Sequence, residues 1–481
     1  MRGLLRNHLR EFERLMKLRR EFWVIQTLSS VLYLFYGIFV TISILYLTND
    51  IGFDDVRAGQ VVAIFLTGAA IVQVCVGPMI DQVGLRKASL VAVSIISVGC
   101  LGVGATPYVA WSEAAGKVIA VIFFLVAALG TGLFFPIPGA GTKRFSNRST
   151  EAPAFSLHYL SINMGFALVF ILDFMRRPLA DNPTKEQIMV YSDAGGNTHV
   201  FFALISLCVV AWAVTYFFLR SEEPFPEFGE AKSLKLPSHQ SFFQIAGEVI
   251  HDREFHRVFV VLMFTIPAHM TLMFPLVLYP KYWVRVLGGD APIGFLSSIN
   301  PVLIIISLIL FSPLVTMSVK RFSTYWTLVG GMIVGGSSTL ILSISPYWVA
   351  EALGADVVGA YYILIFTQML VFVVGESVWS PQLLAYVAHA APLGKEGAYM
   401  GFSRVAFTIA KAVAGGISGY FLLRYCPEGI GEKILSGELA YTESPEFMFL
   451  ILALITLLSP VILIAGAKWL NMKPRVTHKI I

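Results

Sequence analysis

The sequence predicts an all-α membrane protein with about twelve transmembrane helices arranged as two six-helix bundles. Of its 481 residues, 56% are hydrophobic and only 14% are charged, whereas an ordinary soluble domain has about 25% charged residues. Segments such as Phe22–Thr48 and Ala58–Ile80 contain no Asp, Glu, Lys or Arg. Each is longer than the roughly 20 residues that cross a bilayer core as a helix. A long polar loop near the middle of the chain predicts the division into two bundles.

Each span must be helical, because the bilayer core offers no water to backbone N–H and C=O groups. The apolar segments that meet the length requirement predict spans at 23–48, 58–80, 88–107, 116–140, 155–175, 199–219, 257–285, 292–318, 323–346, 357–383, 398–424 and 447–467.

The distribution of Lys and Arg predicts the orientation of these spans. An even number of spans leaves both termini on one side. If that side is cytoplasmic, 24 of the 35 basic residues lie in or beside cytoplasmic segments, nine lie outside, and two fall within a span. Cytoplasmic loops carry the excess of Lys and Arg, so both termini are predicted to be cytoplasmic. The net charge of +5 therefore needs no nucleic acid to explain it.

The longest loop between spans, Ser221–His256, divides the chain into two halves. We expect a basic amphipathic segment at 1–22 that lies on the inner lipid headgroups, a first bundle at 23–220, a linker at 221–256, a second bundle at 257–468 and a tail at 469–481. Duplicated transporters of this plan hold substrate near the middle of the bilayer, at the interface of the two repeats.

The sequence gives no sign of an enzyme, a metal site or a cofactor. The four cysteines, Cys75, Cys100, Cys208 and Cys426, have no metal-binding or disulfide spacing. We find no paired nucleophile and base and no phosphate-binding loop. An enzyme is therefore the least expected class, and a carrier of small solutes is the favoured interpretation.

A short motif follows the second span and contains Gly77, Asp81, Gly84, Arg86 and Lys87. A carboxylate at a helix end can face the positive N-terminus of another helix. Glycine permits a turn with positive φ, and cations suit a cytoplasmic surface with anionic lipids. Considered alone, the motif is equally compatible with an ordinary short loop.

This motif resembles the loop signature of the major facilitator superfamily, Gly-x-x-x-Asp-Arg-x-Gly-Arg-Arg/Lys. Two of the basic positions of the signature are Gln82 and Leu85 here. The resemblance implies the major facilitator fold, with a loop that stabilises the outward-open state and so takes part in gating.

Four further stretches resemble the proton-dependent oligopeptide transporter family within that superfamily. They cover close to half of the chain and occur in the family's order. They are Tyr36-Gly37 with Tyr46-Leu47-Thr48; Gly130-Thr131-Gly132 with Pro136 and His158–Gly165; Ser298-Ile299-Asn300-Pro301; and Gly375-Glu376 with Ser380-Pro381, Ala391-Pro392 and Met400-Gly401.

Glu376 lies in a span that is otherwise free of charge. A carboxylate at that depth is expensive and by default marks a substrate or ion pathway. The alternative is an ion pair with Lys411 or Arg404 that joins two helices. The resemblance implies that Glu376 binds the amino terminus of a peptide.

Asn163 and Asn300 each offer two donors and an acceptor. Without the resemblance, hydrogen bonds between helices would be the better interpretation; with it, both residues are expected to hold the peptide backbone and termini. Tyr36 is expected to line the same cavity, and packing is an equal alternative for it.

The sequence departs from the family's proton-coupling signature, Glu-x-x-Glu-Arg on the first helix. The three charged positions of that signature are Leu28, Val31 and Leu32 here, and the expected helix-two tyrosine is Ala70. The lysine expected before the helix-four proline is Phe135. The first half therefore lacks the cations that would attract a peptide carboxylate.

The second half offers cations instead. Lys411 lies seven residues, about 10 Å, deeper in span eleven than Arg404, which could extend to the surface. Lys411 either pairs with Glu376 or takes part in anion binding or proton exchange. His269, in the middle of span seven, could relay protons, although packing is the commoner role of a lone histidine. We expect Asp173, near the end of span five, to be a solvated rim charge.

The resulting hypothesis is a carrier of di- or tripeptides that works by alternating access with altered or absent proton coupling. Its substrate residues are Tyr36, Asn163, Asn300, Glu376 and Lys411, and its coupling residues are Glu376, Lys411 and His269. The alternatives are a carrier of an amino acid, an amine or another metabolite, and a sensor or assembly subunit that does not transport. We expect a monomer in contact with membrane lipids, in a bacterial inner membrane.

Overall fold

The computed structural model describes most of the chain as helices. The described residues are 16–146, 151–176, 196–220, 251, 253–322, 324–390, 396–437 and 439–470, and they contain no strand. Most of the predicted N-terminal segment, linker and tail lies outside them. The chain forms two compact units, Met1–Ser233 with Pro292–Pro301, and Leu234–Ala291 with Val302–Ile481.

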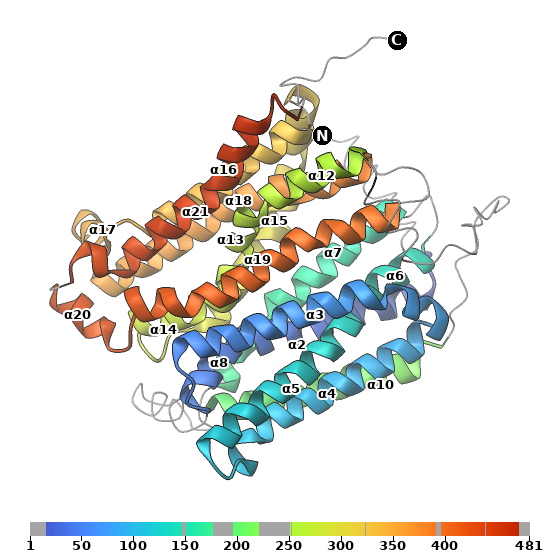
Figure 1. Ribbon diagram of the computed structural model, residues 1–481, viewed down its shortest axis with the longest axis horizontal. Helices are drawn as coiled ribbons and strands as arrows, with labels where there is room; N and C mark the ends of the chain where they lie inside the picture. Colours follow the sequence, from blue (N-terminus) through green and yellow to red (C-terminus); the bar gives the residue numbers. More distant parts are fainter. Residues whose placement is uncertain are drawn as a thin grey trace. The chain divides into compact units, whose positions relative to one another are not determined.

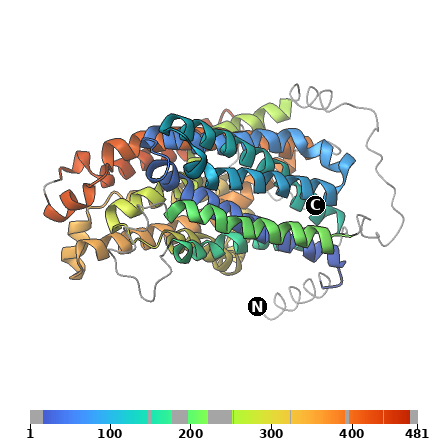
Figure 2. The same ribbon diagram turned by 90° about the horizontal axis from the view of Figure 1, so that it is seen from below.

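Unit 1 is a bundle of long helices (Figure 1). Its elements are α2 (Arg20–Asn49), α3 (Asp55–Val83), α4 (Leu85–Val109), α5 (Glu113–Phe134), α6 (Pro136–Arg144), α7 (Glu151–Ala167), η1 (Leu168–Phe170), α8 (Ile171–Met175) and α10 (Asn197–Phe218). Helix α4 packs against α5 and α10, and α2 packs against α7 and α10. Figure 2 shows the green α10 beside the blue α2.

Unit 2 has the same kind of architecture. Its elements are α12 (Arg253–Phe264), α13 (Ile266–Val277), α14 (Tyr279–Leu287), α15 (Ile293–Phe322), α16 (Thr324–Ile341), α17 (Pro346–Leu353), α18 (Val357–Ala390), α19 (Glu396–Tyr425), α20 (Ile430–Ser436), η3 (Tyr441–Glu443) and α21 (Pro445–Gly466). Helix α16 packs against α18 and α21, and α13 packs against α19 and α21. The first residues of α15 belong to unit 1 and the rest of the helix belongs to unit 2.

The helices confirm the predicted membrane fold. Within the described residues, nine helices are long and apolar enough to cross a membrane, and two bent pairs raise the number to eleven. The bends are 47° between α12 and α13 and 81° between α16 and α17. Pro267 and Pro346 lie in the first turns of α13 and α17. A proline fits the first turn, where no N–H is needed. The remaining predicted span, 292–318, coincides with α15.

Glycines allow α16 and α18 to approach closely in unit 2. A Cβ atom on Gly375 would lie 2.3 Å from the backbone nitrogen of Gly335, and one on Gly331 would lie 2.7 Å from that of Trp379. Small residues four apart are typical of membrane helix interfaces, because they let backbones meet. This crossing fixes the segment of α18 that contains Glu376.

Two aspartates of unit 1 cap the starts of other helices. The Asp50 carboxylate accepts hydrogen bonds from Asn197 and from the backbone and side chain of Thr198 at the start of α10. Burial raises the pKa of Asp50, although these hydrogen bonds act to lower it.

Asp173 on α8 accepts from the backbone nitrogens of Gly294 (2.8 Å) and Phe295 (2.7 Å) in the first turn of α15. The expectation of a solvated rim charge at Asp173 was wrong. A carboxylate at a helix N-terminus satisfies N–H groups that have no partner within the helix.

Candidate functional site

Three of the buried ionisable groups of unit 2 lie on helices that pack together. Glu376 is on α18, His269 on α13 and Lys411 on α19. Their exposed fractions are 8%, 6% and 6%. Helix α13 packs against α19, and α18 also contacts α19. The apolar surroundings supplied by these helices are what make a charged group costly there.

Aromatic side chains connect His269 to Lys411. The imidazole ring lies 5.1 Å from the Trp379 ring and 5.5 Å from the Phe407 ring, measured between centroids. The Lys411 Nζ atom lies 4.8 Å from the centroid of the same Phe407 ring. A cation over an aromatic face is attracted by the ring quadrupole. Phe407 therefore contacts both the histidine and the lysine.

Helix periodicity relates the two aromatic residues to Glu376 and Lys411. Trp379 follows Glu376 by three residues on α18, and Phe407 precedes Lys411 by four residues on α19. Residues three or four apart lie on one face of a helix. The Nδ1 atom of His269 lies 2.9 Å from the carbonyl oxygen of Thr265, one turn earlier. That contact fixes the ring and leaves Nε2 to face other groups.

The sequence did not single out Trp379 or Phe407. The feature of the sequence that could have pointed to them is their spacing of three and four residues from Glu376 and Lys411. Aromatic residues at such spacing are frequent in apolar helices, so the spacing alone does not separate them from ordinary packing residues.

Unit 1 has a different chemistry at its predicted site residues. Tyr36 is 5% exposed and lies among three rings, those of Phe65, Phe135 and Phe166, at centroid distances of 6.3, 5.1 and 6.1 Å. Phe135 occupies the position where the family has a lysine. It contacts Tyr36 edge to face, a favourable geometry for two rings. At this position the chain therefore has an aromatic contact, whereas the oligopeptide transporter pattern has a cation.

The two predicted asparagines are both described. Asn163 on α7 is 6% exposed, and its Nδ2 atom donates to the carbonyl oxygen of Tyr159 one turn earlier (2.9 Å). Gly165, two residues later, packs against α2, where its Cβ atom would lie 2.5 Å from the carbonyl oxygen of Ser30. The Oδ1 atom of Asn300 on α15 is buried and accepts no hydrogen bond from the described residues. A buried acceptor of this kind costs free energy unless a ligand or water satisfies it.

The loop motif after α3 is partly described. Gly84 has a φ of +89° and precedes α4, as expected for glycine at a turn. The Arg86 guanidinium donates to the carbonyl oxygen of Tyr216 (2.9 Å) and lies 5.3 Å from that ring. Lys87 is exposed. Helix α3 includes Gly77 and Asp81, whose side-chain surroundings lie outside the described part of the structure.

A comparison with family models gives a match over residues 27–415 to the model described as Major Facilitator Superfamily. The chain belongs to the Major Facilitator Superfamily. This membership, together with the helical architecture, confirms the fold that the loop motif predicted. It also supports the prediction of a transporter and not an enzyme.

Solved structures share the fold of this superfamily member. One, described in work on substrate recognition in proton-dependent oligopeptide transporters, has a TM-score of 0.70 and 16% identity, with 94% of this chain and 99% of that chain covered. The transporter PepTSo of the POT family has a TM-score of 0.65 and 14% identity over 95% and 99% of the two chains. A D-xylose–proton symporter has a TM-score of 0.63 and 14% identity over 91% and 95%. At these identities the likeness concerns the fold.

A curated relative comes from Bacillus subtilis (strain 168). It is YwtG, provisionally named a metabolite transport protein, and it is 24% identical over 133 residues. The match covers 28% of this superfamily member and 27% of the length of that relative.

Proposed function

We propose that the protein is a secondary transporter of di- or tripeptides and peptide-like solutes that works by alternating access. The observation that carries this proposal is that three ionisable groups at predicted site positions of unit 2, Glu376, Lys411 and His269, are buried. Charged groups inside membrane helices are costly and are retained where they handle ions or substrates. The superfamily membership supports transport, and the family motifs around Asn163, Asn300 and Glu376 support the substrate class.

The roles of the individual residues follow from their chemistry. The Glu376 carboxylate would bind a substrate ammonium group. Lys411 would bind a carboxylate or exchange a proton, with Phe407 in contact with its ammonium group. Asn300 offers a buried acceptor, and Asn163 and Tyr36 would complete the polar and aromatic contacts. Lys411 and His269 are the groups that could couple proton movement to transport, together with Glu376.

The coupling is proposed to differ from that of typical oligopeptide transporters. The three positions of the helix-one signature are apolar here, and Leu28 and Leu32 are 0% and 3% exposed. These side chains pack in the core of unit 1 and cannot exchange protons. The coupling of proton movement to solute transport is therefore assigned to unit 2. If the residues of unit 2 do not couple the two, the protein is a passive facilitator.

The proposal also includes the orientation of the chain in the membrane, the type of membrane and the oligomeric state. Both termini are placed in the cytoplasm because of the asymmetry of Lys and Arg. A bacterial inner membrane and a monomer are proposed with it, as is the gating role of the loop that contains Arg86.

Uptake of a labelled dipeptide into proteoliposomes tests the proposal. The expected result is accumulation above equilibrium under an inward proton gradient in wild type, and its loss in Glu376→Gln. Equilibration without accumulation would indicate a facilitator. No uptake by folded protein under either condition would exclude peptides as substrates.

A second substrate class is favoured by one observation in unit 1. The ring of Phe135 contacts Tyr36 where the family has a lysine, which suits a substrate without a carboxylate at that end, such as an amine. A thermal-shift panel separates the two classes. Stabilisation by amines, with no response to dipeptides, would replace the peptide assignment.

A further inference from the structure

Helix α14 of unit 2 carries two cations whose side chains are buried. The exposed fractions of the Lys281 and Arg285 side chains are 3% and 6%. The helix begins directly after Leu278, at the end of α13. The residues lie four apart on one face, as positions one turn apart do. Tyr279, Tyr282 and Trp283 of the same helix are also buried, so the two charges lie in largely apolar surroundings.

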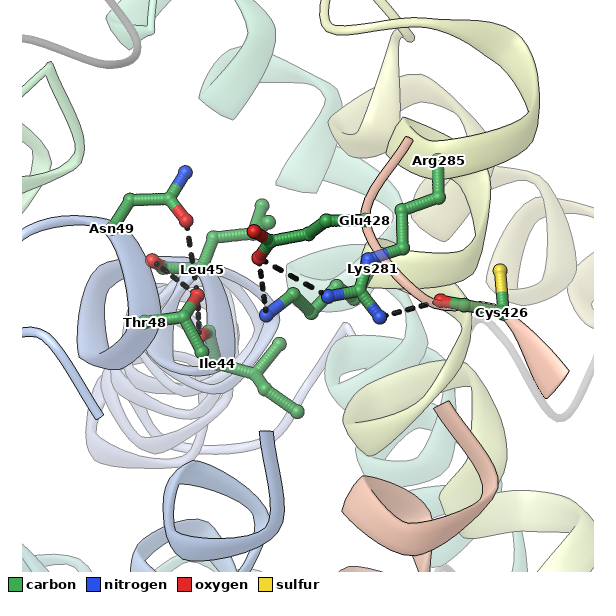
Figure 3. Close-up of polar contacts among 8 residues, drawn as sticks. All are labelled: Ile44, Leu45, Thr48, Asn49, Lys281, Arg285, Cys426 and Glu428. Carbon is green, nitrogen blue, oxygen red and sulfur yellow. Dashed lines mark hydrogen bonds and ion pairs between the residues drawn. The ribbon is translucent and has the colours of Figure 1, made fainter. Parts of the chain in front are cut away.

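Both cations point at one oxygen atom of a loop carboxylate. The Oε1 atom of Glu428 lies 3.3 Å from an Arg285 guanidinium nitrogen and 3.9 Å from Lys281 Nζ. Figure 3 shows the Glu428 side chain reaching the two cationic ends from one side. The other guanidinium nitrogen of Arg285 donates to the carbonyl oxygen of Cys426 (2.6 Å), which anchors the loop to α14.

The carboxylate differs from its partners in exposure. The Glu428 side chain is 79% exposed. An exposed carboxylate is well hydrated and gains little by staying in an ion pair, whereas buried cations depend on a negative partner. The Glu428 carboxylate itself therefore loses little by moving into solvent, but the two buried cations then need another anion in its place. The cationic ends that it touches can then be reached from solution.

The backbone around Glu428 keeps this arrangement in place. Gly429 has a φ of +74°, and a Cβ atom on Gly431 would lie 3.1 Å from the carbonyl oxygen of Arg285. Ile430 and Ile434 of α20 are buried. The loop is thus fixed against α14 on both sides of Glu428, while the Glu428 side chain itself is exposed.

From this geometry we propose that Lys281 and Arg285 form a carboxylate-binding site for the transported solute, and that Glu428 occupies it as an exchangeable internal anion. The proposal rests on the transport function and names one part of its substrate class, a small solute with a free carboxylate. A substrate carboxylate takes the place of Glu428 and receives charge-assisted hydrogen bonds from both cations. The site supplies, from unit 2, cationic groups that the predicted site positions of unit 1 lack.

Binding of a matched pair of probes to purified protein tests this site. The probes are N-acetylalanine and its amide, which differ only in the carboxylate, and the readout is the concentration that gives half of the maximal thermal shift. Wild type should prefer the acid. Glu428→Gln removes a competing anion, so it should bind the acid about 2- to 5-fold more tightly, the range for an ion pair whose carboxylate is exposed to solvent. Binding of the amide should not change. Lys281→Gln should lose the preference for the acid.

Glu443→Gln is the matched control. Glu443 is also exposed (57%) and pairs with Arg424 at 3.7 Å, but that arginine is itself 59% exposed. The control should leave both probes unaffected. If Glu428→Gln and Glu443→Gln behave alike, or if Lys281→Gln keeps the preference for the acid, the site is overturned. If dipeptide uptake is absent while the acid still binds in a Glu428-dependent manner, the peptide assignment fails and the carboxylate site stands.

Discussion

The two units differ in the chemistry of their predicted site residues. In unit 1 they are neutral: Tyr36 packs against three phenyl rings, and Asn163 donates to its own helix. In unit 2 they are ionisable: Glu376 and Lys411 are buried. Unit 1 is neutral at these positions because apolar residues replace the charged residues of the family's signature. The buried charges of unit 2 point to a function, because burying a charge within membrane helices is costly.

This contrast teaches that one unit can be specialised for packing and shape and the other for charge. In the proposed function, unit 1 supplies walls and amide groups, while unit 2 supplies the groups that bind charge and move protons. Variants in the two units should therefore differ in kind, and four predictions test this, from the largest expected effect to the smallest.

Glu376→Ala should have the largest effect on uptake. Truncating a buried charged group that contacts a ligand costs about 2–5 kcal/mol, which corresponds to a loss of about 30-fold or more. The measurement is the initial rate of dipeptide uptake in proteoliposomes. Asn163→Ala in unit 1 is the comparison and should reduce the rate less. Equal losses in the two variants would contradict the assignment of charge chemistry to unit 2.

Gly331→Val should destabilise unit 2 by about 1–3 kcal/mol, because the added side chain overlaps the backbone at Trp379 and forces α16 away from α18. Thermal unfolding in detergent measures this. Gly330→Val is the control, since a Cβ atom on Gly330 would meet no described atom within 4 Å outside its own stretch of helix. If both variants melt at the same temperature, the close crossing does not position Glu376 as inferred.

Asp173→Ala should cost about 0.5–2 kcal/mol, the usual value of a lost N-terminal cap. Asp173→Asn retains an acceptor and should recover most of the loss. Unfolding in a denaturant series measures both variants. A full loss in the asparagine variant would show that the charge, and not the cap, is what the first turn of α15 needs.

Tyr36→Phe should have the smallest effect on stability, about 0.5 kcal/mol, because the contacts of the ring with three neighbouring rings persist and the net contribution of a hydroxyl group is at most that of one hydrogen bond. Tyr46→Phe in the same helix loses a hydrogen bond to the carbonyl oxygen of Val103 and should cost about 1 kcal/mol. Uptake by Tyr36→Phe then isolates any role of the hydroxyl in binding. A large loss of uptake at unchanged stability would give unit 1 a chemical role beyond packing.

The sequence predicted the helices well, because long apolar runs leave few alternatives in a membrane. All twelve predicted spans coincide with helices or bent pairs. It also drew attention to Glu376, Lys411 and His269, since a polar group in an apolar run stands out. It did not identify Trp379 and Phe407, whose role comes from contacts between helices distant in sequence.

Asp173 shows the same limit more sharply. Its partners are the backbone nitrogens of residues 294 and 295, which no pattern of side chains could reveal. The sequence analysis did not single out Glu428 either, because its partners lie more than 140 residues earlier on α14.

The cap on α15 has a consequence for the way the chain can be divided. A cut between residues 221 and 250 yields two fragments that match the two predicted bundles. Yet unit 1 includes Pro292–Pro301, and this segment would remain on the second fragment. Asp173, on the first fragment, could then cap α15 only if the two fragments associated. The first fragment alone would thus be missing part of its own folded unit. Separately expressed halves should regain a complete unit 1 by fragment complementation, with the start of α15 supplied by the other half.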